Sequence, residues 1–152
     1  MDTLDSGLTV IHHEERDSSV FSPYVPGIKV VHGALVFLSG VTAAPVYHDH
    51  PHVPEVFNGI PQDIEGQVAL TFEHVDRGLR AAGCRRDQVV ALFRFFTDID
   101  ADQDVVNRVQ AEYFGEHHPT HTSVEVTRLA PDRRLRLELQ VIAVASGPEG
   151  MG

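Results

Sequence analysis

The sequence predicts a single α+β domain in which two helices cover one face of a largely antiparallel sheet. Residues 63–83 and 100–116 carry apolar side chains at helical spacing, whereas the runs rich in β-branched and aromatic residues are short and alternate with polar residues. The predicted order is two strands, a helix, a strand, a helix and two strands. A chain of 152 residues can bury one core, so we expect one domain over residues 1–152.

Before the first helix the chain is divided by turns. Residues 8–11 form an apolar patch suited to an edge strand, and the β-rich runs 28–32 and 34–41, separated at Gly33, favour a hairpin. Residues 42–61 form a long loop rich in histidine and proline. A loop of this length inside one domain is usually functional or mobile.

The remaining elements have clear start and stop signals. Asp63 suits the N-cap of the first helix and Gly83 suits its end, while the acidic residues 100–104 are expected to cap the second helix. Strands are expected at residues 87–96, 120–131 and 134–145.

Alternation along these strands predicts which residues share a face. The apolar rows expected toward the helices are Thr122, Val124 and Val126; Ala91, Phe93 and Phe95; and Leu135, Leu137 and Leu139. The polar residues expected on the opposite face are Arg94, His121, Ser123, Glu125, Arg136, Glu138 and Gln140. Because Val90, Leu92 and Phe96 also belong to that face, we expect it to be an oligomer interface, with Arg94 paired to Glu125 or Glu138.

Charge and composition narrow the classes of partner. The formal net charge of -10 argues against nucleic acid and anionic membranes, which both need a basic surface. No apolar run approaches the roughly 18 residues of a membrane span, and residues 1–5 lack a signal-peptide pattern. We therefore expect a cytoplasmic protein whose partners are small molecules and copies of itself.

The polar row of the strand at residues 120–126 is the strongest functional signal. His121, Ser123 and Glu125 place an imidazole, a hydroxyl and a carboxylate on one strand face. Histidine can carry out general acid and base chemistry near neutral pH. This row is therefore a candidate catalytic site.

The loop at residues 42–61 offers a second, weaker pattern. His48, His50 and His52 followed by Glu55 are ligands suited to zinc, iron or nickel. Pro51 and Pro54, however, prevent a regular strand that would align them. The preferred interpretation is a solvated loop. Whether it acts as a lid stays open, and neither a metal nor another cofactor is expected.

Several short motifs together resemble one family. These motifs are residues 22–27 (SPYVPG), 38–41 (LSGV), 81–83 (AAG), 95–98 (FFTD), 106–107 with 113–114 (VN and YF), 123–129 (SVEVTRL) and 138–144 (ELQVIAV). Over residues 20–145 the chain resembles the reactive-intermediate deaminase family, Rid/YjgF. The resemblance implies a chorismate-mutase-like fold with a six-stranded sheet, and a homotrimer whose inward sheets form a barrel. It also implies small-molecule sites between subunits, where enamines and imines are hydrolysed with release of ammonia.

The resemblance also implies roles for individual residues. His121 stands where the family has the arginine that binds the substrate carboxylate, and Gln140 stands where the family has a glutamate that handles water. Tyr24 and Asn107 match the family, and Ser123 replaces a frequent cysteine. On this basis the expected catalytic residues are His121, Ser123 and Gln140. The expected substrate-binding residues are Tyr24, Arg94, Asn107 and Glu138.

Three functions stay open at the level of sequence. The preferred one is a divergent Rid-type enzyme of specialised metabolism that acts on a reactive carbonyl, imine or enol-like intermediate, with His121 moving a proton. The second is a conventional enamine or imine deaminase in which another group replaces the missing arginine. The third is a catalytically silent trimer that binds ligands or proteins.

Overall fold

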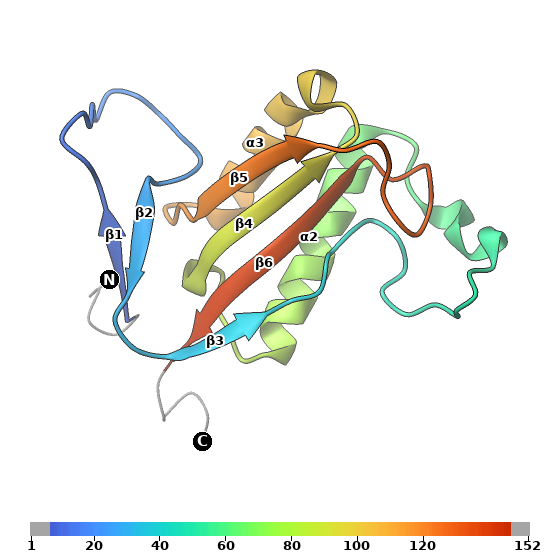
Figure 1. Cartoon of the computed structure of the whole chain (residues 1–152), viewed down its shortest axis with the longest axis horizontal. Helices are drawn as coiled ribbons and strands as arrows, with labels where there is room; N and C mark the ends of the chain where they lie inside the picture. The colour runs from blue at the N-terminus through green and yellow to red at the C-terminus, as the bar shows by residue number, and fades with distance from the viewer. Residues whose placement is uncertain (1–6, 147–152) are drawn as a thin grey trace.

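Four strands form the main sheet of the computed structural model, which describes residues 7–146 (Figure 1). Residues 1–5, on which the expected lack of a signal peptide rests, lie outside the described part. The strand order is β3-β6-β4-β5, with β4 and β5 parallel and the other neighbours antiparallel. The bounds are Ala34–Phe37 for β3, Val89–Phe96 for β4, Thr120–Glu125 for β5 and Leu137–Ala145 for β6.

Helices α2 (Ile64–Ala81) and α3 (Ile99–Phe114) lie side by side on one face of this sheet (Figure 1). Asp63 caps α2 as predicted, because its carboxylate accepts a hydrogen bond from the backbone of Gly66. The cap of α3 is Asp98, just before the predicted acidic residues 100–104. Two short 3-10 helices, η1 (Pro54–Gly59) and η2 (Arg86–Gln88), complete the described helical elements.

The core between helices and sheet follows the apolar stripes. Its fully buried side chains include Val68, Val75, Leu92, Phe96, Val106, Leu137, Leu139 and Val141. The expected α+β architecture with two main helices on one sheet face is therefore present. None of the described helices combines the length and apolar character needed to cross a membrane.

The first two strands correct the prediction of one six-stranded sheet. Strand β1 (Leu8–Ile11) pairs with β2 (Gly27–Val30) in a separate two-stranded sheet, so the predicted hairpin of residues 28–41 does not form. Gly33 redirects the chain into β3 instead: its φ is +119°, and a Cβ there would lie 2.5 Å from the carbonyl oxygen of Ala145.

The orientation predicted for strands β4 and β5 is wrong: the face of each strand that was expected to be open lies against the helices. Leu92 and Arg94 are buried on the helix side, whereas Phe93 is 38% exposed. The parallel register aligns Leu92 with His121 and Arg94 with Ser123, so these two residues of β5 also face the helices. Thr122 and Val124, like Ala91, Phe93 and Phe95, therefore lie on the open face.

Of the polar residues predicted on the open face, only Glu138 and Gln140 lie there. Glu125 accepts a hydrogen bond from the backbone of Ile99 in α3, and Arg136 forms an ion pair with the buried Asp102 of the same helix. Strand β4 is apolar on both faces, so alternation alone could not orient it. Polar residues of α3 provide hydrogen-bond partners beneath the helix, and this decides the orientation.

The open face of the sheet is left strongly apolar. Leu35 and Phe37 on β3 are 57% and 63% exposed, and Val124 on β5 is 43% exposed. The β1–β2 sheet packs against one end of this face through Leu8, which contacts Val90 and Val144. The rest is an exposed apolar surface of the kind that marks an interaction site.

Candidate functional site

A buried arginine organises the candidate site. Arg94 is only 2% exposed. Its Nε donates to the hydroxyl of Ser123 at 2.8 Å, and its Nη1 donates to Asn107 Oδ1 at 2.8 Å and Gln110 Oε1 at 3.0 Å. These partners are all neutral, so the expected pairing of Arg94 with Glu125 or Glu138 is wrong: both carboxylates lie elsewhere.

The same network fixes the protonation of His121. Gln110 must turn Oε1 toward Arg94, because a guanidinium only donates. Its amide nitrogen then faces His121, and Gln110 Nε2 lies 3.1 Å from His121 Nδ1. Nδ1 therefore accepts this hydrogen bond, and the proton of the neutral ring is assigned to Nε2.

Burial and charge reinforce this neutral form. Desolvation, with the nearby charge of Arg94, lowers the pKa of His121 to about 4. Burial also lowers the pKa of Arg94 to about 10, which leaves it charged at neutral pH. In this form the ring of His121 presents a hydrogen-bond donor at neutral pH, and its expected role in moving a proton stays a prediction.

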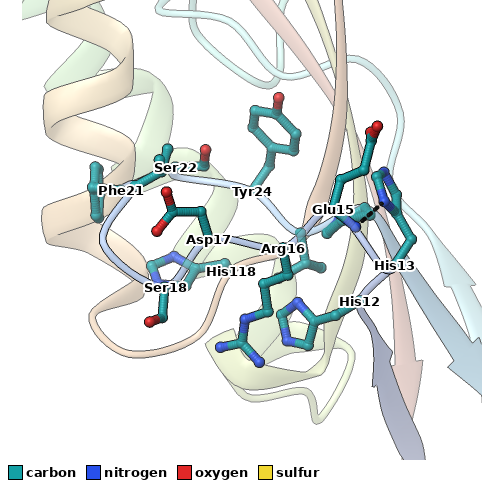
Figure 2. A pocket seen from close by; sticks show the side chains of 13 residues that line it. His12, His13, Glu15, Arg16, Asp17, Ser18, Phe21, Ser22, Tyr24 and His118 are labelled. Atoms are coloured by element: carbon teal, nitrogen blue, oxygen red, sulfur yellow. Dashed lines mark hydrogen bonds between the residues drawn. The ribbon is translucent and has the colours of Figure 1, made fainter.

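Tyr24 connects this network to a cavity. Its ring lies 4.5 Å from that of His121, centroid to centroid, and its side chain is 43% exposed. The cavity, of about 510 Å³, is open to solvent on one side and is lined by the segment between β1 and β2 and by His118 (Figure 2). This volume suits a small molecule.

The cavity wall is rich in polar groups. Arg16, His12, Asp17 and Ser22 come from the segment between the first two strands (Figure 2). His118 contributes a buried Nδ1 for which the described residues provide no hydrogen-bond partner. A bound molecule with a polar group can satisfy that nitrogen, because buried polar atoms are normally paired.

The predicted site residues fall into two groups. Five of them meet at the network: Tyr24, Arg94, Asn107, His121 and Ser123. The other two, Glu138 and Gln140, line a separate cavity of about 320 Å³ on the open sheet face, together with Arg128 and Phe95. Burial raises the pKa of Glu138.

Sequence reasoning missed Gln110, which links Arg94 to His121. A signal was present: Gln110 lies four residues after Val106 and four before Phe114, inside the buried stripe of α3. A fully buried glutamine at such a position requires polar partners. It therefore indicates a polar group on the sheet beneath it.

Comparisons with known proteins agree on one family. Residues 16–145 match the protein-family model described as Endoribonuclease L-PSP. The chain is 33% identical over 135 residues to the Escherichia coli K12 protein named "Putative reactive intermediate deaminase TdcF", covering 87% of this chain and 94% of that protein. It is 29% identical over 133 residues to the 2-iminobutanoate/2-iminopropanoate deaminase of Salmonella typhimurium LT2, with coverage of 86% and 93%.

Solved structures give the same result. The crystal structure of E. coli TdcF with bound serine superposes with a TM-score of 0.61 at 32% identity, covering 84% of this chain and 91% of that one. The YyfB protein of Yersinia pestis, of the Rid family, superposes with a TM-score of 0.72 at 19% identity, covering 91% and 98%. The second likeness supports the fold alone.

Proposed function

The chain belongs to the endoribonuclease L-PSP family, which includes the Rid proteins, and on this premise we propose that it hydrolyses a small reactive imine or carbonyl compound. The proposal rests on one observation, the series of hydrogen bonds that runs from Arg94 through Gln110 to His121. These hydrogen bonds leave the Nε2–H of His121 free to donate to a substrate. A relative named as a 2-iminobutanoate/2-iminopropanoate deaminase supports the class of reaction.

In this proposal His121 polarises the electrophile. Nε2–H donates to the imine nitrogen or carbonyl oxygen, and a neutral imidazole suits this role because it stabilises negative charge that develops there. With an imine substrate, water adds to the carbon and one of its protons passes to the nitrogen, which gives a carbinolamine. The hydroxyl proton then also passes to the nitrogen as the C–N bond breaks, which leaves a carbonyl compound and ammonia. The ring keeps its own proton throughout.

A carboxylate is still needed to accept the proton of the attacking water. Gln140 cannot do so, because an amide is not a base. Glu138 lies two residues earlier on the same face of β6, and a carboxylate whose pKa is raised by burial is a better base. We assign proton acceptance to Glu138 and orientation of the water to Gln140.

The two groups of site residues lie on opposite faces of the main sheet, so in this proposal the complete site requires a second copy of the chain. The exposed apolar surface around Phe37 and Phe93 supports a homo-oligomer, and the family resemblance favours a trimer with clefts between subunits. In such a cleft, Glu138 and Gln140 of one copy complete the site that His121 and Tyr24 form in the next.

A second candidate is a conventional deaminase acting on an imine that carries a carboxylate. Arg94 favours it, because a buried cation with only neutral hydrogen-bond partners attracts an anion.

Cleavage of RNA, which the family description names, is disfavoured because a net charge of -10 repels a polyanion.

The test compares turnover of uncharged imines with turnover of 2-aminoacrylate generated in the assay. Replacing His121→Ala is expected to lower kcat for the uncharged substrate roughly 100-fold, the usual cost of losing one such donor. His121→Arg, which restores the family residue, is expected to favour the carboxylate-bearing substrate. His32→Ala removes an exposed histidine away from the site and serves as the control.

Unchanged turnover in His121→Ala would contradict the role of His121. Equal use of both substrates by the wild type would favour the conventional deaminase. A wild-type protein that binds these compounds without consuming them would instead be the catalytically silent trimer.

A further inference from the structure

Three histidines outside the candidate site converge in the loop before η1. The ring centroids of His48, His50 and His52 lie 4.9, 5.1 and 4.7 Å apart in pairs. One ring nitrogen from each lies within 4.8 Å of the others. Three imidazoles brought this close would repel one another if protonated, and a shared cation removes that conflict.

The surroundings of His48 prepare it as a ligand. Its Nδ1 lies 2.8 Å from the carbonyl oxygen of Pro45, which can only accept, so Nδ1 carries the proton and Nε2 keeps a free lone pair. A backbone carbonyl that orients a histidine in this way is the usual support of a metal ligand. Phe57, which is 1% exposed, packs edge-on against His48 and His52 and forms an apolar base under the cluster.

We propose that His48, His50 and His52 bind one divalent transition-metal ion, with Zn²⁺ as the best match. Imidazole nitrogens suit Zn²⁺ and not Mg²⁺ or Ca²⁺, which require oxygen ligands. A tetrahedral zinc with Zn–N bonds of about 2.0–2.1 Å needs nitrogens about 3.3 Å apart. The nitrogens lie within 4.8 Å of one another in the structure, so binding requires the exposed rings of His50 and His52 to move closer to His48, with water as the fourth ligand.

This proposal revises the expectation from sequence that no metal binds here. The objection was that Pro51 and Pro54 prevent a strand, but the three rings converge from an irregular loop and no strand is needed. Glu55, the fourth residue of the sequence pattern, lies in the first turn of η1 and is not part of the converging group. The site is therefore a three-histidine site.

The ion would hold the loop beside a cavity of about 670 Å³. His48 and Tyr47 line this cavity together with Glu138 and Gly78. Cross-linking His48 to His52 fixes the loop at that wall. Metal binding stands independently of the proposed catalytic reaction, because none of its ligands belongs to the network around Arg94.

The test titrates the untagged full chain with metal ions. Calorimetry measures the binding of Zn²⁺ alone, and visible absorption measures the binding of Co²⁺ in a separate titration. We expect one ion per chain and the intense absorption bands of tetrahedral Co²⁺. The double variant His50→Ala/His52→Ala is expected to lower affinity by roughly 100-fold or more, since each lost ligand costs at least about tenfold. Both side chains are exposed, so circular dichroism should confirm an unchanged fold.

The matched control is His12→Ala/His13→Ala, which removes two adjacent exposed histidines from another loop. It should keep the affinity and the Co²⁺ bands of the wild type. The proposal is overturned if the wild type shows no saturable binding of one ion, or if both double variants lose affinity equally.

Discussion

The two faces of the sheet differ in how their polar residues are buried and paired. Beneath α3, Arg94 is almost fully buried and each hydrogen bond recorded for it ends on a neutral acceptor. On the open face, Phe37 and Phe93 are exposed while Glu138 and Gln140 sit among them. The polar residues on the helix side are thus paired within one chain, whereas the open face keeps an exposed apolar surface, which we propose that a second copy covers.

This difference distinguishes the residues that fix the geometry of the site, beneath α3, from the residues proposed to complete it, on the open face. Buried polar groups that are fully paired specify a single arrangement, so the tautomer of His121 is set before any substrate binds. The residues proposed to handle water lie on the open face, which is the proposed interface between copies. Mutations on the open face should therefore change the oligomeric state, whereas mutations beneath α3 should change the stability of the folded chain.

The largest effect is expected on the open face. Phe37→Asp places a charge in the proposed interface, where burying an unpaired carboxylate costs several kcal/mol. Sedimentation should change from a trimer of 16.8 kDa chains to a monomer. Tyr47→Asp, at an aromatic side chain that is 93% exposed in the histidine loop, should leave the mass unchanged. A wild type that is already monomeric would refute the interface.

A smaller effect is expected beneath the helix. Arg94→Met leaves the acceptors of Ser123, Asn107 and Gln110 unpaired in a buried place, at a cost of about 3 kcal/mol in free energy of unfolding. Urea denaturation at fixed protein concentration measures it. Arg77→Met, at an exposed arginine paired with Glu73, should cost less than about 0.5 kcal/mol. Equal losses in both variants would show that the network contributes no special stability.

The smallest effect concerns pH. The pKa of His121 is about 4 in the folded chain against an ordinary 6.5, so between these values the unfolded chain binds a proton that the folded chain does not. Stability should therefore fall as pH drops from 6.5 to 4. His121→Gln should remove roughly 1–2 kcal/mol of this fall, discounted because the ring is partly exposed to screening solvent.

Glu138→Gln provides the contrast on the other face. Burial raises the pKa of Glu138 above its ordinary 4.5, so its contribution to stability is present below that value and is lost as pH rises through the folded pKa. The two variants should shift the pH profile in opposite directions. Shifts of the same sign would mean that one of the two environments is misassigned.

Much of the fold could be predicted because its signals are local. The apolar stripe of α2 and its cap at Asp63, the alternation of β6 and the family motifs all lie within short segments. The orientation of β4 could not be predicted, because a strand that is apolar on both faces has no preferred side. The pairing of β1 with β2 could not be predicted either, because the turn at Gly33 that leads the chain away from a hairpin is explained only by the backbone of β6 beside it.

For the site, the sequence by itself supplied the candidate residues, and the family resemblance places His121 where the family arginine is expected. Only the tertiary structure decided what that histidine does. Gln110 and Arg94 lie 11 and 27 positions away along the chain, and their hydrogen bonds fix which ring nitrogen of His121 holds the proton. Tautomers and pKa values depend on distances and burial across elements, which no local pattern of residues encodes.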